Sequence, residues 1–229
     1  MTKLILFDID GTLLTKATGH GLAFSHAFKE VFGIETTIAI IPHSGMTDQQ
    51  IIIEVLKKHH LTEDVIIKKM PECMHSMIDF YEKIKEKNKP VILEGVLDVL
   101  KEFEKEKFIL GLVTGNLEPI ARAKLTSIGI NQYFKLGGFG NDDISRSRLV
   151  ELAIKRAEEN FTFTFDKNVF LFGDTPNDIK AGIDTGVNVV GIATGIFSIE
   201  DLRKAGAKYV VNSFVDKNKI LDIIFEKSS

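Results

Sequence analysis

The sequence has little of several features that would place it in particular classes of protein. It contains one cysteine in 229 residues, and its 29 lysines and arginines are nearly balanced by 32 aspartates and glutamates. One cysteine excludes a disulfide framework and fits a reducing compartment. A net charge of -3, with both signs interspersed, provides no basic patch, so we expect no nucleic-acid partner.

Long hydrophobic runs are also absent. No apolar stretch approaches the roughly 20 residues that are needed to span a bilayer, and the first residues lack the charged segment and cleavage site of a secretory signal. We therefore expect a cytoplasmic protein with no membrane segment. The chain is 44% hydrophobic, which is enough to build a substantial core.

The chain is organised around the segment Leu4–Thr12, in which four apolar residues lead into Asp8, Asp10 and Gly11. An apolar run without alternation favours a strand that is buried on both faces, as in a parallel sheet covered by helices. Asp8 and Asp10 are two residues apart, so both carboxylates leave an extended chain on the same side. Two anions in one volume need a cation, and Mg²⁺ fits because it takes oxygen ligands and shares them with phosphates.

Residues 15–88 are predicted to form an all-helical block. Thr15–Gly21 is expected to be a loop. The first helix after it is predicted from phenylalanines at helical spacing, Phe24, Phe28 and Phe32. Two more helices are expected to begin at the capping residues Thr47 and Thr62. The glycines at 19 and 21 and the break at 88–90 are expected to act as a hinge between this block and the rest of the chain.

After Pro90, strand and helix patterns alternate. Strands are expected at 108–113, 136–139, 169–172, 187–192 and 209–211, with helices near 95–106, 117–128, 147–159, 178–185, 198–205 and 217–225. This alternation predicts an α/β fold, a doubly wound Rossmann-like parallel sheet. We expect a catalytic core of residues 1–14 and 89–229, with residues 15–88 inserted after the first strand as a helical cap.

Polar residues follow two further strands. Thr114, Gly115 and Asn116 come after one of them, and Asp174 and Asp178 come after another. A hydroxyl beside an amide can donate to phosphate oxygens, and the second acidic pair can complete a magnesium site. The structural alternative is that Asn116 caps the helix that follows it and that Thr175 or Asn177 caps the helix that begins near Pro176.

Together these motifs resemble those of the haloacid dehalogenase superfamily of phosphohydrolases. Asp8-Ile9-Asp10-Gly11-Thr12 resembles its first motif, Thr114-Gly115-Asn116 its second, and Gly173-Asp174-Thr175-Pro176-Asn177-Asp178 its fourth. The helical insertion resembles the C1 cap of the phosphoglycolate phosphatase-like branch. The resemblance covers nearly the whole chain.

The resemblance implies a Mg²⁺-dependent phosphatase that hydrolyses a small soluble phosphate monoester, phosphoglycolate-like, through an aspartyl-phosphate. Asp8 would be the nucleophile and Asp10 the acid and base. Magnesium would bind the Asp8 carboxylate, the Asp10 backbone carbonyl and Asp174, while Asp178 orients a bound water. Thr114, Gly115, Asn116 and Arg146 would hold the substrate's phosphate.

One departure from the family pattern concerns the third motif, where a lysine is usual. This chain has Arg146 and Arg148 in that region, followed by Lys155. Arg146 is the expected replacement because of its position before Leu149 and Val150, Arg148 is the second candidate, and Lys155 lies too far along the helix; the structural alternative is a solvated charged turn. Arginine keeps the charge and adds a planar fork, so phosphate binding is retained with altered geometry.

Other chemistries remain as alternatives. A phosphomutase, a dehalogenase and a non-catalytic protein that binds a phosphorylated ligand would share this fold. All six histidines fall in the block 15–88, so we expect none at a core strand end. Cys73 lies among methionines at helical spacing and is expected to fill the core. His43–Thr47, at a helix entrance in the cap, is a candidate for substrate contact.

Overall fold

The structure is a computed structural model that describes residues 2–15, 18–166 and 168–225. Its strands are β1 (Leu4–Phe7), β2 (Ile109–Thr114), β3 (Leu136–Phe139), β4 (Val169–Gly173), β5 (Asn188–Ile192) and β6 (Tyr209–Val211). Its helices are α1 (Thr18–Phe32), α2 (Asp48–Lys58), α3 (Glu63–Ile84), α4 (Val96–Lys105), α5 (Glu118–Ser127), α6 (Arg146–Asn160), α7 (Pro176–Thr185), α8 (Ile199–Lys204) and α9 (Lys217–Phe225).

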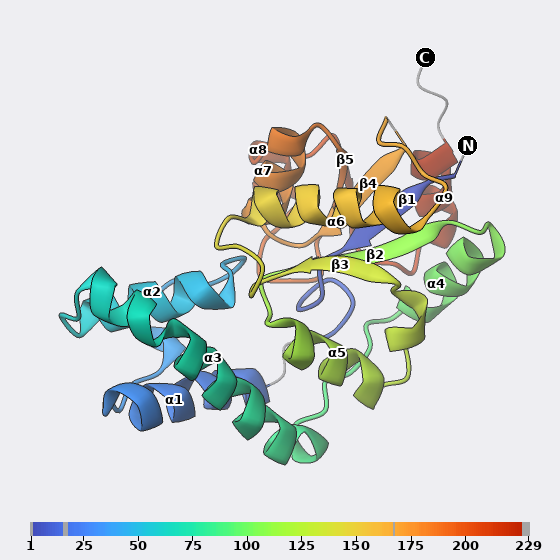
Figure 1. The fold of residues 1–229 in the computed structure, drawn as a ribbon. Coiled ribbons are helices and arrows are strands. Elements are labelled where there is room, and N and C mark those ends of the chain that lie inside the picture. Colours follow the sequence, from blue (N-terminus) through green and yellow to red (C-terminus); the bar gives the residue numbers. More distant parts are fainter. Residues whose placement is uncertain (1, 16–17, 167, 226–229) are drawn as a thin grey trace.

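The strands form one parallel sheet in the order β3-β2-β1-β4-β5-β6. Strand β1 lies between β2 and β4, and helices cover both faces of the sheet (Figure 1). The carboxyl ends of these three neighbouring strands therefore meet at one edge, which is where ligands bind in sheets of this kind. The predicted doubly wound α/β fold is confirmed.

Side chains of β1 alternate between two hydrophobic clusters. Ile5 and Phe7 pack with residues of α4, α5 and α9 on one face, while Leu4 and Leu6 pack with residues of α6 on the other. All four side chains are completely buried. This two-sided burial explains why the apolar run of β1 shows no alternation, and it fixes the point at which Asp8 leaves the sheet.

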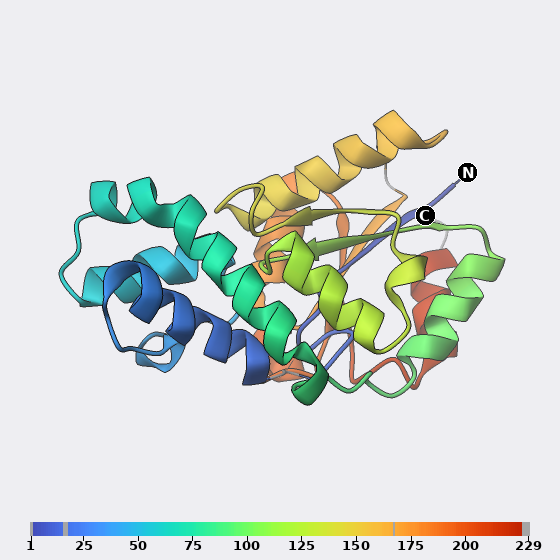
Figure 2. The ribbon, with the colours of Figure 1, turned by 60° about the horizontal axis from the view of Figure 1, so that its bottom comes forward.

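Helices α1, α2 and α3 lie together beside the carboxyl edge of the sheet, away from α4 and α9 (Figures 1 and 2). Their buried residues form a separate cluster, and this cluster also contains Leu117 and Ile120 at the start of α5. The cap helices thus share part of their apolar core with a helix of the sheet domain. The division into a core of 1–14 and 89–229 and a cap of 15–88 stays a prediction.

The expected loop at Thr15–Gly21 is wrong in its second half, because α1 begins at Thr18. The Thr18 hydroxyl donates to Asn88 Oδ1 at 3.1 Å, and a Cβ on Gly19 would lie only 2.8 Å from Asn88 Cβ. Glycine at 19 therefore permits close packing against the return segment, a tertiary effect that its local sequence does not show. Both glycines of the expected hinge therefore lie in this helix. Residues 16 and 17 of the expected loop lie outside the described residues.

Within the three described segments, no helix combines the length and the hydrophobicity needed to cross a membrane. The expectation of no membrane-spanning helix agrees with this finding.

Candidate active site

Three strand ends bring the predicted site residues to one place. Asp8 follows β1, Thr114 ends β2 and Asp174 follows β4. The Asp8 backbone N–H donates to the Phe172 carbonyl at 2.9 Å, which extends the pairing of β1 and β4 up to the site. The motifs that are far apart in the sequence therefore become neighbours through the parallel sheet.

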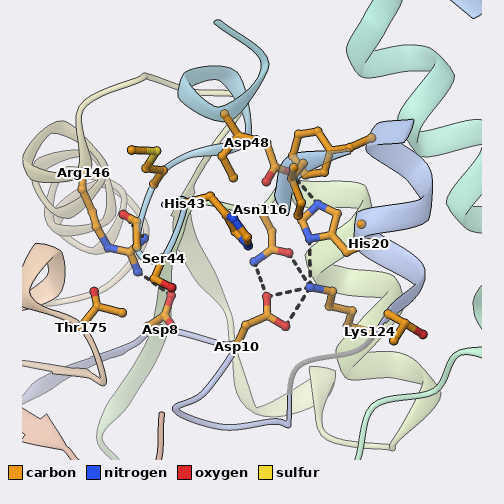
Figure 3. A pocket seen from close by; sticks show the side chains of 18 residues that line it. Asp8, Asp10, His20, His43, Ser44, Asp48, Asn116, Lys124, Arg146 and Thr175 are labelled. Atoms are coloured by element: carbon orange, nitrogen blue, oxygen red, sulfur yellow. Dashed lines mark hydrogen bonds and ion pairs between the residues drawn. The ribbon is translucent and has the colours of Figure 1, made fainter. Parts of the chain in front are cut away.

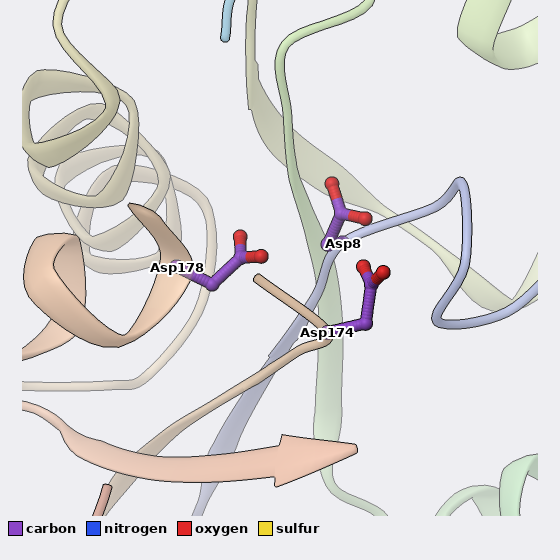
Figure 4. Close-up of side chains that lie close together, drawn as sticks. All are labelled: Asp8, Asp174 and Asp178. Carbon is purple, nitrogen blue, oxygen red and sulfur yellow. The ribbon is translucent and has the colours of Figure 1, made fainter. Parts of the chain in front are cut away.

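Asp8, Asp174 and Asp178 form a buried acidic cluster (Figure 4). One carboxylate oxygen from each lies within 4.8 Å of the others. Burial raises the pKa of Asp8 well above its usual range; the Arg146 guanidinium opposes this rise, and the charges of Asp178 and Asp174 add to it. Oxygen donors crowded in this way suit a hard divalent cation, so the residues present fit a metal site.

Two details separate the roles of the acidic residues. The Asp178 carboxylate caps α7, accepting from Thr175 N at 3.1 Å and Thr175 Oγ1 at 2.7 Å. Asp174 instead borders the turn after β1, where a Cβ on Gly11 would lie 2.4 Å from its Oδ2 and where φ of Gly11 is +94°. Glycine is thus required at 11, and Thr175 does cap its helix as the structural alternative expected.

Arg146 is the third-motif cation that the structure brings into the site. Its Nη2 lies 2.5 Å from Asp8 Oδ1, and its Nε donates to Asp178 Oδ1 at 2.7 Å. It is the first residue of α6 and is 91% buried, whereas Arg148 is exposed and pairs with Glu151 on the surface. The two carboxylates raise the pKa of Arg146 despite its burial, so its charge is secure.

Asp10 lies at the other end of the site and has different partners. Lys124 Nζ lies 2.6 Å from Asp10 Oδ2 and 2.9 Å from Oδ1, and Asn116 Nδ2 donates to Oδ2 at 2.8 Å. Burial acts to raise the pKa of Asp10, but Lys124, His20 and Asn116 outweigh it and leave this pKa below its usual value. Asp10 is therefore an anion in the resting protein.

The second motif forms the wall between these two ends. The hydroxyl oxygen of Thr114, a fully buried residue, accepts from Asn116 Nδ2 at 2.7 Å. Gly115 lines the cavity, and a Cβ there would lie 2.2 Å from the Met46 carbonyl oxygen, so glycine allows the cap to approach. Asn116 caps no helix, because the N-cap residue of α5 is Leu117.

A cavity of about 260 Å³ lies over these groups (Figure 3). Asp8 and Arg146 stand at one end, and Asp10 and Lys124 stand at the other. The cap side contributes residues of α1, α2 and the segment that leads into α2, among them Phe24, Ile38, His20, His43, Ser44, Gly45, Met46 and Asp48. A cavity of this size suits a small molecule.

Sequence reasoning missed Lys124, His20 and Asp48. His20 comes from the cap helix α1 and lines the cavity. Its Nδ1 lies 3.3 Å from Lys124 Nζ, and its Nε2 lies 3.0 Å from Asp48 Oδ2. The available signal was Lys124 itself, a lysine inside the buried stripe of α5 between Ala121 and Leu125. A charge in such a stripe is rare without a partner.

Comparison with known proteins agrees with this geometry. The family model of haloacid dehalogenase-like hydrolases matches residues 5–192. The chain is 25% identical to a putative pyrophosphatase PpaX of Clostridium perfringens over the full length of both proteins. It is 24% identical to a phosphoglycolate phosphatase of Vibrio vulnificus, over 97% of this chain and 96% of that protein.

A solved hydrolase from Pseudomonas syringae has the same fold, with a TM-score of 0.73 and 20% identity, covering 97% of this chain and 99% of that one. The protein belongs to the haloacid dehalogenase-like hydrolases. The resemblance that the motifs indicated is therefore confirmed.

Proposed function

We propose that this protein is a phosphatase that hydrolyses a small soluble phosphate monoester, phosphoglycolate-like, with Mg²⁺ and through an aspartyl-phosphate. The observation that carries the proposal is the pairing of Asp8 with Arg146 beside the buried carboxylates of Asp174 and Asp178, at the closed end of a small cavity. The names of the relatives, phosphatases and pyrophosphatases, support the same reaction class.

Asp8 is the nucleophile in this proposal. One of its carboxylate oxygens attacks phosphorus, and the bond between phosphorus and the leaving oxygen breaks. Arg146, Gly115 and Asn116 hold the phosphate oxygens in place, and most of the catalysis comes from this positioning and from charge neutralisation. Thr114 lies behind Asn116, and its predicted contact with phosphate stays a prediction.

Asp10 is the general acid and base in this proposal. It protonates the leaving oxygen, and it later accepts a proton from the water that attacks the aspartyl-phosphate. Because the pKa of Asp10 is lowered, Asp10 first takes the remaining proton of a substrate monoanion and then passes that proton to the leaving oxygen. The water step then regenerates Asp8 and releases inorganic phosphate.

The carboxylates of Asp8 and Asp174 and the Asp10 backbone carbonyl are assigned to a magnesium ion. When bound, Mg²⁺ would neutralise charge on the transferring phosphoryl group. Asp178 is assigned to a metal-bound water, because Arg146 and Thr175 already engage both of its oxygens. In this assignment the cap, residues 15–88, closes the cavity over the reacting groups.

The test is a panel of small phosphate esters, including phosphoglycolate, assayed with Mg²⁺ and with a chelator. We expect release of inorganic phosphate that stops with the chelator and returns when Mg²⁺ is restored. Undiminished hydrolysis in chelator would overturn the metal assignment. Turnover that requires a bisphosphate activator would indicate a phosphomutase, halide release from haloacids a dehalogenase, and thermal stabilisation by esters without turnover a binding protein.

A further inference from the structure

Lys124 is a buried cation that the proposed reaction does not use. The residue is 1% exposed and lies in the last turn of α5. Its Nζ contacts acceptors on three residues: Asp10 Oδ2 at 2.6 Å, Asn116 Oδ1 at 2.6 Å and His20 Nδ1 at 3.3 Å. An ammonium has three N–H donors, so each acceptor residue receives one of them. Burying such a charge is costly, which indicates that its placement serves a purpose.

The contact with Lys124 determines the tautomer of His20. A lysine ammonium can only donate, so His20 Nδ1 accepts and the ring hydrogen lies on Nε2. Nε2 then donates to Asp48 Oδ2 at 3.0 Å, and the same oxygen accepts from Leu117 N at 2.9 Å. These bonds form an unbroken chain from Asp48 on α2, through His20 on α1, to Lys124 and Asp10 (Figure 3).

The two ends of this chain belong to different parts of the fold. Asp48 and His20 lie on cap helices, whereas Lys124 lies on α5 and Asp10 follows β1. The contact between His20 and Lys124 exists only when the cap lies against α5 as it does here. Lys124 in turn contacts both oxygens of the Asp10 carboxylate and so restricts its rotation.

We propose that Lys124 is a positioning residue, which His20 holds in place from the closed cap, and which aims the Asp10 carboxylate at the leaving oxygen of the substrate. The inference rests on the proposed function and extends it. It makes the placement of the proton-transfer group depend on cap closure, while Arg146 at the phosphoryl end is held mainly by the core carboxylates of Asp8 and Asp178. Positioning of this kind matters because a small displacement of a reacting group lowers the rate strongly.

The test compares two esters that differ in their need for a proton. An alkyl phosphate must have its leaving oxygen protonated, whereas p-nitrophenyl phosphate releases a stable phenolate. In Lys124→Met, we expect kcat/KM for the alkyl ester to fall about tenfold to a hundredfold more than for the aryl ester, since losing the position of Asp10 removes part of a general-acid contribution of about 10²- to 10⁴-fold. Lys155→Met is the matched control, because Lys155 is an exposed lysine paired with Glu159 on α6.

Two substitutions of His20 separate position from charge, since both leave Lys124 intact. His20→Asn places an acceptor near the position of Nδ1, whereas His20→Gln places a donor near Nε2 and removes the acceptor for Lys124. We expect His20→Asn to keep the alkyl-to-aryl ratio within about twofold of the unaltered protein. His20→Gln should lower that ratio about threefold to tenfold, the range of one lost hydrogen bond.

An unchanged ratio in Lys124→Met, or equal losses in the two His20 variants, would overturn the inference. The His20 pair keeps the test decisive if Lys124→Met fails to fold. Failure of the proposed function has a different signature, because the unaltered protein would then hydrolyse neither ester.

Discussion

Asp8 and Asp10 follow the same strand, two residues apart, yet they stand in opposite surroundings. Asp8 lies among carboxylates, and burial together with those charges raises its pKa well above the usual value despite Arg146. Asp10 lies against Lys124 and Asn116, and these partners with His20 bring its pKa below the usual value despite burial. The two carboxylates, on either side of Ile9, thus belong to a centre in which three carboxylates face one arginine and to a centre in which one carboxylate is paired with a lysine.

The two ends also differ in which parts of the chain build them. The charged groups around Asp8 lie at the ends of β1 and β4 and on α6 and α7, and the cap adds a contact through the Gly45 carbonyl, which accepts from Arg146 Nη1 at 3.4 Å. The groups around Asp10 come from α5, from Asn116 just before it and, through His20 and Asp48, from the cap. A phosphoryl site whose charged groups all come from the core suits a reaction centre common to many substrates. A leaving-group site that the cap completes suits selection among those substrates.

The largest expected effect lies at the Asp8 end. Asp8→Asn should reduce magnesium-dependent turnover below detection, because an amide oxygen does not form the phosphoryl-enzyme bond. The substitution is nearly isosteric, so the fold should persist, as checked by circular dichroism and thermal unfolding. Full retention of activity would contradict the proposed nucleophile. Asp222→Asn, at an exposed residue of α9, is the surface control.

The next effect tests the cation at the same end. Arg146→Ala should lower kcat/KM about tenfold or more, since a charge-assisted contact is worth roughly 1.5 to 3 kcal/mol. It should also lower the free energy of unfolding by about 3 to 5 kcal/mol in chelator, because it leaves Asp8 and Asp178 unpaired. Mg²⁺ should restore part of this stability by supplying positive charge.

Arg148→Ala is the matched control for Arg146→Ala. Arg148 is exposed and its partner is Glu151 on the surface, so stability and activity should change by less than about 0.5 kcal/mol. A greater loss of activity in Arg148→Ala than in Arg146→Ala would move the third-motif role to Arg148.

The difference between the two ends also explains what the sequence could predict. Around Asp8, each group lies at or near the end of a buried strand or at the start of a helix, and such positions follow from hydrophobic pattern and motif spacing. Arg146 could be selected over Arg148 because of its position before the apolar pair Leu149 and Val150. The central strands of the sheet could also be predicted from the sequence, because β1, β2 and β4 are nearly continuous apolar runs.

Around Asp10, the decisive contacts are tertiary, and no local pattern encodes them. His20 belongs to a stretch with two glycines that favours a loop, yet packing against Asn88 makes it helical. Lys124 stands out as a charge in an apolar stripe, but the pattern does not name its partners, because the acceptors lie 8, 104 and 114 residues away. Long-range pairing of this kind is visible only after the cap has been placed on α5.

The smallest effect concerns a single contact that seats the cap. Gln49, at the start of α2, donates through Nε2 to the Gly140 carbonyl at 2.8 Å and so joins the cap to the segment after β3. A net hydrogen bond contributes about 0.5 to 1.5 kcal/mol, which changes the ratio of closed to open forms by about two- to tenfold. Other contacts at this joint remain, because Asp48 N donates to Gly115 O at 2.8 Å.

For Gln49→Ala, we therefore expect kcat/KM for an enclosed alkyl ester to fall about two- to threefold, with p-nitrophenyl phosphate nearly unaffected. The reason is that the core holds the phosphoryl end, whereas the leaving-group end requires the seated cap. Gln50→Ala is the control, since Gln50 neighbours Gln49 on α2 and has the same partial burial. A loss above about tenfold, or an equal loss for both esters, would show that cap seating and phosphoryl chemistry are not separable in this protein.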